Sequence, residues 1–230
     1  MFIDIEIVKQ KLQSQGFIIN DPWDIVDAFE KKVADYAGSK FGVSVDNCTD
    51  ALFLCLKYLE NKTTTKEIVI PKRTYLSVPQ SIIHAGYKPV FKDIEWDGCY
   101  HLEPLPIVDS ATKFTKGMYV KDTYYCLSFH KKKNLPISKG GMILTDDYEF
   151  YKWLKIARYE GRHTELLYED DDIDFLGWNM YMPPEQAARG IVLFDELVKK
   201  YSDSPVPNCG GSYKYRDLTT LTVFKEFKND

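Results

Sequence analysis

Three consecutive lysines, Lys131 to Lys133, follow the apolar run YYCLSF (124–129) and precede a pair of glycines. The run predicts a buried strand, and α/β folds bind their ligands beyond the carboxyl ends of such strands. A lysine amine at that place can attack a carbonyl carbon and, once free again, transfer protons. For any single lysine, a hydrated surface charge is the simpler interpretation.

A second candidate site lies where the run FGVSV (41–45) meets CTDALFLCLKYLE (48–60). The apolar positions of the second segment predict a helix buried on a broad face, with Asn47 or Thr49 as its cap. A helix that begins directly after a strand directs free N–H groups and a positive dipole end at one place, which favours phosphate. Such junctions are common in α/β proteins, so this one alone identifies no ligand.

The remaining pattern alternates between strands and helices. Strands are predicted at 41–45, 67–71, 88–94, 105–109, 124–129 and 141–146, and helices at 22–37, 48–60, 76–85, 147–160 and 183–200. This alternation predicts an α/β fold of three layers, in which helices flank a mostly parallel sheet. Residues 168–184 are expected to form a long ordered loop, and LTTLTVFKEF (218–227) a final strand.

Composition narrows the function classes. The chain has 230 residues, is 44% hydrophobic and carries a formal charge of -4 with both signs interspersed, which argues against nucleic-acid binding. Five cysteines without a C-x-x-C pair suggest neither a disulfide framework nor a zinc site, so no metal is expected. Without a leader-like N-terminus or a run of roughly twenty apolar residues, we expect a cytoplasmic protein outside the membrane.

The lysine run and the glycine pair together resemble the active-site strand and turn of the DegT/StrS-type sugar aminotransferases, which depend on pyridoxal phosphate (PLP). That family reads S-F-x-x-x-K, then two glycines seven and eight residues later. The matching residues here are Ser128, Phe129, Lys133, Gly140 and Gly141. The resemblance implies a PLP-dependent fold of type I, with Lys133 as the Schiff-base lysine and Lys131 and Lys132 as ordinary charges.

Two further segments resemble the parts of this family that bind the cofactor phosphate and ring. DNCTDAL (46–52) is similar to the family's phosphate-binding turn, which implies that Cys48 and Thr49, together with the Ser128 hydroxyl, contact the phosphate. PKRTYLS (71–77) resembles the segment whose aromatic residue stacks on the cofactor ring, which implies that role for Tyr75.

Two more segments match in the family's order. IVDSATKF (107–114) resembles a D-x-A motif, so the resemblance implies that Asp109 pairs with the pyridine nitrogen. Thr112 stands where the family has His or Gln and is kept as a candidate cofactor contact. GWNMYMPPEQAARGIVLFDEL (177–197) is similar to the run whose asparagine, here Asn179, reaches the phosphate bound by the neighbouring subunit.

Each of these candidate residues could instead have a purely structural role. Asp109 could cap a helix, Tyr75 could pack in a core or an interface, and Asn179 could occupy a turn. Cys48 could be a small buried group, and His130, beside the lysines, has no evident catalytic partner.

The chain also departs from the family pattern. Only EWDGCYHLEP separates the runs ending at 94 and beginning at 105, so one β–α unit is expected to be missing. The family continues into a smaller C-terminal domain, which implies a reduced PLP-binding domain at 1–200 and a remnant at 201–230. Lys139 replaces the usual acid before the glycines, and Tyr181 the usual Arg or Lys.

The resemblance implies transfer of an amino group from an amino acid, glutamate first, to a keto-sugar that is nucleotide-linked and destined for polysaccharide. It also implies a homodimer with shared sites. Three alternatives stay open. The chain could be a PLP-dependent sugar dehydratase or another PLP enzyme, although family members that dehydrate sugars typically replace the lysine. It could be a non-catalytic partner of a full-length enzyme, or a second chain could supply the small domain and dock at Tyr213 and Tyr215.

Overall fold

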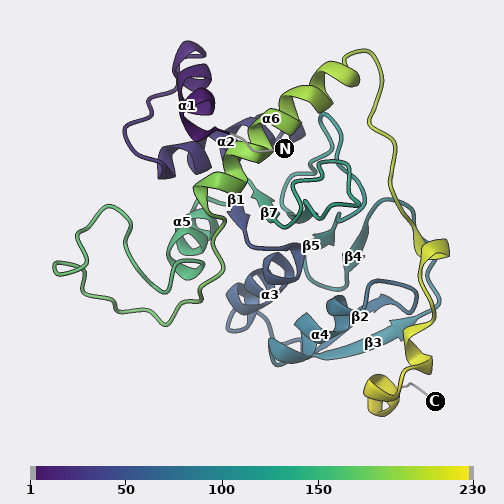
Figure 1. The fold of residues 1–230 in the computed structure, drawn as a ribbon. Coiled ribbons are helices and arrows are strands. Elements are labelled where there is room, and N and C mark those ends of the chain that lie inside the picture. Colours follow the sequence, from purple (N-terminus) through teal and green to yellow (C-terminus); the bar gives the residue numbers. More distant parts are fainter. Residues whose placement is uncertain (1–3, 228–230) are drawn as a thin grey trace.

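A computed structural model describes residues 4–227 of the chain (Figure 1). Its helices are α1 (Ile5–Ser14), α2 (Trp23–Ala37), α3 (Cys48–Leu59), α4 (Ser77–His84), α5 (Tyr148–Ala157) and α6 (Pro184–Lys200). Its strands are β1 (Phe41–Val45), β2 (Glu67–Pro71), β3 (Lys88–Lys92), β4 (Tyr100–Leu102), β5 (Ile107–Asp109), β6 (Tyr124–Ser128) and β7 (Gly141–Thr145). Three short 3-10 helices follow, at Ser212–Lys214, Leu218–Thr220 and Thr222–Phe227.

The main sheet is mixed, so the prediction of a mostly parallel sheet was wrong. Its order is β1-β7-β6-β5-β4, and within it only β5 and β6 pair in parallel. The reason lies in the connections. The link from β4 to β5 has four residues and the link from β6 to β7 contains no helix, whereas parallel neighbours need a longer crossover.

Strands β2 and β3 form a separate parallel pair beside this sheet. Val69 on β2 exchanges two backbone hydrogen bonds, of 2.8 and 3.1 Å, with Glu103 directly after β4. The short strand β4 therefore occupies the place between β2 and β5. It lies in the segment where the sequence analysis expected a missing β–α unit and predicted no strand.

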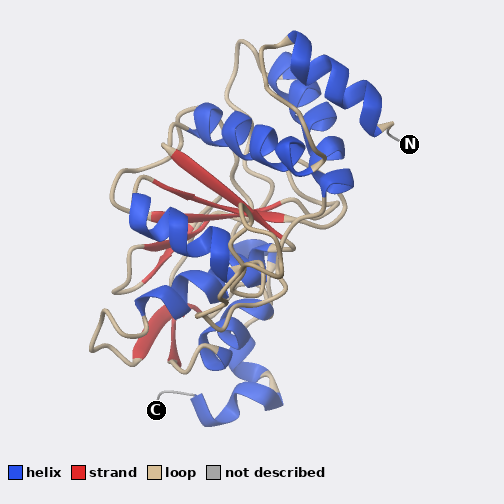
Figure 2. Cartoon of the chain, turned by 90° about the vertical axis from the view of Figure 1, so that its left-hand side faces the viewer, coloured by secondary structure: helices blue, strands red, loops and turns tan. Residues whose placement is uncertain are grey.

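The fold has three layers, as the sequence pattern predicted (Figure 2). Successive strand residues point to opposite faces, so Cys126 and Ile143 pack with α3 and α5, while Leu127 and Leu144 pack with α2 and α6. Each face of the sheet is thus covered by helices and buries its own hydrophobic cluster. The two clusters fix the sheet between them and hold its strand ends in place.

The predicted helices agree with α2 to α6 within one to three residues at their ends. Helix α1 was not predicted. The expected strand at 218–227 was wrong, since this stretch forms 3-10 turns. Asp217 explains the difference, because its carboxylate accepts hydrogen bonds from both the N–H and the hydroxyl of Thr219, at 3.0 and 2.6 Å, and such local bonds favour turns over strands.

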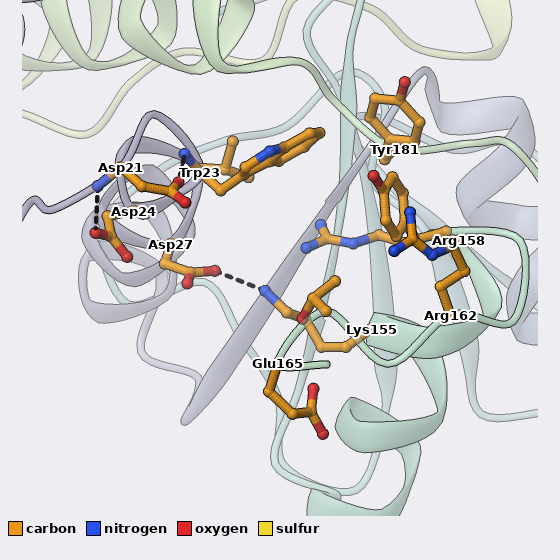
Figure 3. Close-up of a pocket in the computed structure, with 12 residues that line it drawn as sticks. Asp21, Trp23, Asp24, Asp27, Lys155, Arg158, Arg162, Glu165 and Tyr181 are labelled. Carbon is orange, nitrogen blue, oxygen red and sulfur yellow. Dashed lines mark hydrogen bonds and ion pairs between the residues drawn. The ribbon is translucent and has the colours of Figure 1, made fainter. Parts of the chain in front are cut away.

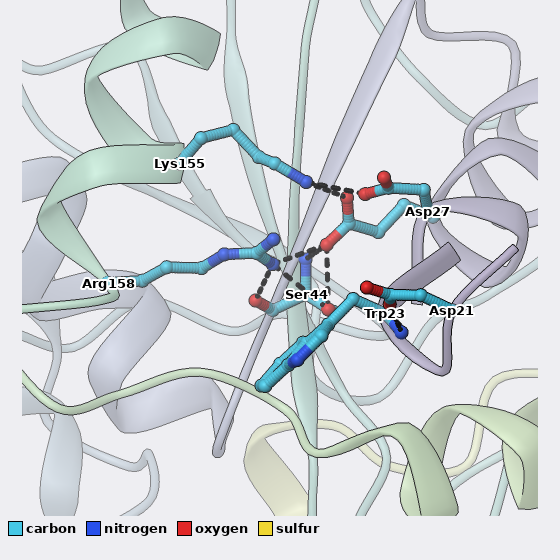
Figure 4. Close-up of polar contacts among 7 residues, drawn as sticks. Asp21, Trp23, Asp27, Ser44, Lys155 and Arg158 are labelled. Atoms are coloured by element: carbon cyan, nitrogen blue, oxygen red, sulfur yellow. Dashed lines mark hydrogen bonds and ion pairs between the residues drawn. The ribbon is translucent and has the colours of Figure 1, made fainter. Parts of the chain in front are cut away.

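A buried ion pair joins α2, β1 and the end of α5 (Figure 4). The Arg158 guanidinium donates to the Glu30 carboxylate and to the Ser44 carbonyl, and Ser44 donates to Glu30 through its N–H at 2.8 Å and its hydroxyl at 2.7 Å. Lys155 adds a 3.1 Å contact to the same carboxylate. Burial alone raises the pKa of Glu30, but Arg158, Lys155 and Ser44 outweigh it and lower that pKa to about 2.

We expect Glu30→Gln to lower the free energy of unfolding by about 3 to 5 kcal/mol at pH 7, because it leaves Arg158 buried without its anion. The pKa of Glu30 is lower in the folded chain than its ordinary 4.5, so this stabilisation is complete above pH 4.5 and disappears as the pH falls towards about 2. Denaturant titrations at several pH values measure both effects.

The control is Glu149→Gln, which removes an exposed ion pair to Lys152 and should cost at most about 1 kcal/mol. Equal losses in the two variants at pH 7 would show that the Glu30 network contributes no more than a surface pair.

Candidate functional site

The candidate site forms where β5, β6 and the first turns of α3 and α4 meet. The sulfur of Cys48, the first residue of α3, lies 3.6 Å from the Cys126 carbonyl oxygen on β6. The neighbouring Thr49 hydroxyl donates to Ser77, the first residue of α4, at 2.7 Å. These contacts bring together three of the segments that the sequence analysis singled out.

Asp109 is the buried charge of this site. It ends β5 and is 5% exposed, and its carboxylate accepts a 2.6 Å hydrogen bond from the Tyr100 hydroxyl and a 2.9 Å bond from the Ala111 N–H. The Thr74 hydroxyl lies 2.5 Å from the Tyr100 oxygen and continues the chain of bonds. Burial raises the pKa of Asp109, although Tyr100, Ala111 and Lys133 act in the opposite direction. A cation that bound beside this carboxylate would relieve the cost of its burial.

The lysine loop places its three amines differently. Lys131 and Lys132 are exposed, whereas Lys133 is half-buried. Lys133 is close enough to Asp109 and Cys48 to lower the pKa of both groups, although burial outweighs it and leaves both pKa values raised. The loop is anchored by buried Leu135 and Ile137, so the position of Lys133 is set by packing.

The N-terminus of α3 faces the same place. Asn47 caps the helix, and its side-chain oxygen accepts from the Asp50 N–H at 3.0 Å. The first N–H groups of a helix have no partner within it, so those of Cys48 and Thr49 are available to an anion. Gly141 permits the close approach of β7 to this turn, because a Cβ there would lie 2.6 to 2.7 Å from backbone atoms of Asn47 and Cys48.

Acidic groups at the edge of this turn are balanced by Lys139. Burial, and then the neighbouring Asp46, raises the pKa of Asp50 to about 6, while Lys139 and Asn47 act against the rise. Lys139 also forms an ion pair with Asp46. The residue that departs from the family pattern before the glycines therefore neutralises a carboxylate beside the free N–H groups.

The other predicted residues take different positions. Tyr75 lies directly before α4 with its side chain 62% exposed, and Ser128 is half-buried at the end of β6. Thr112 is buried, and its hydroxyl lies 2.9 and 2.8 Å from the carbonyls of Gly98 and Gly210. Asn179 is exposed in the loop before α6 and donates to Glu160 at 2.7 Å.

Two tyrosines near this site, Tyr100 and Tyr215, were not among the predicted site residues. Tyr100 comes from the unpredicted strand β4, and Tyr215 from a turn-rich segment far along the chain. Burial raises the pKa of Tyr100 well above its usual range, so it is a neutral donor to Asp109. Each is one of sixteen tyrosines, and no local pattern distinguishes either of them.

A cavity of about 320 Å³ lies away from this site, between the start of α2 and the end of α5 (Figure 3). Trp23 borders it and contacts Tyr159 and Tyr181 edge to face, with ring centroids 5.6 and 5.3 Å apart. Arg162 packs over Tyr159, its guanidinium carbon 5.4 Å from the ring centroid. These aromatic contacts fix the loop that carries Asn179, because Asn179 forms a β-bridge with Tyr159.

Comparison with known proteins relates the sequence of this chain to a family. Residues 4–124 and 120–202 match the DegT/DnrJ/EryC1/StrS aminotransferase family. The chain is 27% identical to the spore coat polysaccharide biosynthesis protein SpsC of Bacillus subtilis over 82% of its own length, and 29% identical to the dTDP-3-amino-3,6-dideoxy-alpha-D-galactopyranose transaminase of Aneurinibacillus thermoaerophilus over 53%.

The same fold occurs in a solved structure from Bacillus cereus that is described as a PLP-dependent aminotransferase. The TM-score is 0.67 at 18% identity, over 88% of this chain and 68% of that one. The chain spans 60% of the length of SpsC and 34% of the Aneurinibacillus transaminase. Within residues 4–227, no helix is both long and apolar enough to cross a membrane.

We expect Asp109→Asn to make the free protein more stable to denaturant at pH 7. The pKa of Asp109 is raised above its ordinary 3.8 in the folded chain, so its stabilising protonated form is lost as the pH rises through the folded pKa. The free energy of unfolding of the variant, relative to that of the wild type, should therefore increase as the pH rises from acid to neutral. The control is Asp172→Asn, on the exposed loop, which should change the free energy of unfolding by at most about 0.5 kcal/mol relative to the wild type. If Asp109→Asn proved less stable than the wild type at pH 7, this account of the carboxylate would be contradicted.

Proposed function

The chain belongs to the DegT/DnrJ/EryC1/StrS aminotransferase family of PLP-dependent enzymes, and on this premise we propose that it binds PLP and transfers an amino group from an amino acid to a keto-sugar. Glutamate is the first candidate donor, and a nucleotide-linked sugar the first candidate acceptor. The relative from Aneurinibacillus is a transaminase of a dTDP-linked sugar, which supports this choice.

The observation that carries the proposal is a buried carboxylate with an amine within electrostatic reach but no ion pair between the two among the described contacts. Asp109 is held by Tyr100 and Ala111, and Lys133 is close enough to influence its pKa. A protonated pyridine nitrogen would supply the cation that this buried carboxylate lacks. The free N–H groups of α3 suit a phosphate on the same molecule.

The proposal assigns each candidate residue a role in binding the cofactor or in proton transfer. Asp109 pairs with the ring nitrogen, Tyr75 stacks on the ring, and Thr49, Ser128 and the N–H of Cys48 contact the phosphate. PLP, when bound, withdraws electrons from the carbon that loses or gains a proton. The Lys133 amine binds the cofactor covalently and later carries that proton.

Thr112 is proposed to hold the backbone around the site in place, because its hydroxyl already donates to the Gly98 and Gly210 carbonyls. Asn179 is proposed to reach the phosphate of a second copy in a homodimer. Its exposure supports that role, and its bond to Glu160 holds the side chain on the surface until a partner binds.

We expect PLP with borohydride to attach a stable pyridoxyl group to Lys133, located by mass spectrometry of the digested protein. Lys133→Ala should reduce labelling at least tenfold, because the half-buried amine is lost. Lys132→Ala is the matched control. It removes the exposed lysine next to Lys133, so labelling at Lys133 should persist. Equal labelling of the three lysines, or labelling unaffected by Lys133→Ala, would contradict the assignment.

Amino transfer itself is tested with glutamate and a panel of dTDP- and UDP-linked keto-sugars. We expect 2-oxoglutarate to form together with an aminated sugar, and both products to disappear in Lys133→Ala. A chain that binds PLP at Lys133 but yields neither product with any donor or acceptor would instead fit a non-catalytic partner of another enzyme.

A further inference from the structure

Residues 207–218, called here the C-terminal segment, descend beside β4 and β2 (Figure 1). Their first half is tied to the two segments that carry the proposed chemistry. The Asn134 side chain, next to the lysines, donates to the Pro207 carbonyl at 2.8 Å. The Thr112 hydroxyl, three residues after Asp109, lies 2.8 Å from the Gly210 carbonyl.

The second half of the C-terminal segment is tied to the opposite side of the site. The Ser212 N–H donates to the Trp96 carbonyl at 2.9 Å, and the Leu218 N–H donates to the Lys72 carbonyl, directly after β2, at 2.8 Å. Because both halves are hydrogen-bonded to segments that surround the site, the C-terminal segment has a fixed position beside it.

Tyr215 is the residue of this segment whose ring is directed at the site. It stacks on Trp96 with centroids 5.7 Å apart and planes at 26°, and its ring lies edge-on to Tyr75 at 6.4 Å. Trp96 in turn packs on Tyr100, the donor to Asp109, at 4.8 Å. These rings form one continuous group that runs from Tyr100 through Trp96 and Tyr215 to Tyr75.

Tyr215 and Tyr213 lie in different surroundings, and Tyr215 is the more buried of the two. Burial raises the pKa of Tyr215 to about 12, with further contributions from Asp109 and Cys48 among the nearby groups. Tyr213, two residues earlier, is 71% exposed, with Lys214 over its ring. The two tyrosines of one short segment therefore differ sharply in their surroundings.

We infer that Tyr215 is a binding residue of the proposed PLP site, and that its ring contacts the bound cofactor together with Tyr75. This inference rests on the proposed function. Such a contact adds an aromatic surface from the far end of the chain, whereas the other cofactor contacts proposed within one chain lie between residues 48 and 133. Tyr215 is thus assigned to binding and positioning, with no proton transfer.

Equilibrium dialysis with PLP tests the inference on variants of the full chain. Tyr215→Ala should raise the dissociation constant roughly five- to tenfold, the loss expected for one aromatic contact. Tyr213→Ala should leave it unchanged. An unchanged constant in Tyr215→Ala would overturn the inference, and so would tighter binding, since that would show that the ring obstructs the cofactor.

Hydrogen exchange of the wild type gives an independent readout that needs no variant. Added PLP should slow exchange at residues 47–52 and also at 212–216. Slowing at 47–52 alone would overturn the role of Tyr215 and leave the proposed function intact. Slowing at neither place, with no labelled Lys133, would overturn both.

Discussion

The burial of the Asp109 carboxylate is the constraint around which the candidate site is arranged. A charge removed from water is costly unless hydrogen bonds or an opposite charge compensate for it. Tyr100 and the Ala111 N–H supply two hydrogen bonds, and Lys133 lies within electrostatic reach. The carboxyl pKa is nevertheless raised, because these groups offset only part of the cost of burying its charge. This cost supports the proposal that Asp109 pairs with a positive group on the cofactor.

The antiparallel pairing of β4 and β5 in the mixed sheet brings a hydrogen-bond donor to this carboxylate. Strand β4 is three residues long and antiparallel to β5, and it brings the Tyr100 hydroxyl to the carboxylate that ends β5. A longer parallel crossover at this place would carry a helix between the two strands instead. The buried Glu30 and Arg158 pair performs a comparable task on the other side of the fold, where it joins α2 and β1 to the loop after α5.

Local sequence signals predicted much of this protein, and contacts between distant segments account for what they missed. The cap at Asn47 and the apolar face of 48–60 predicted α3 to within one residue. Lys133 was singled out only by the resemblance to a known family, and its role stays a prediction. Tyr100 could not be predicted, because its role depends on a strand of three residues that gains its stability from β5. The prediction for 218–227 was wrong for a related reason, since β-branched residues favour strands only where a neighbouring strand is available, and here Asp217 supplies local bonds instead.

A crystal structure of the protein grown with PLP would test the central claim most directly. The account predicts continuous density from the cofactor to the Lys133 amine, with the ring nitrogen within about 3 Å of the Asp109 carboxylate and the phosphate at the first turn of α3. Cofactor attached to Lys131 or Lys132, or a ring nitrogen remote from Asp109, would contradict it and would leave the buried carboxylate without the partner proposed for it.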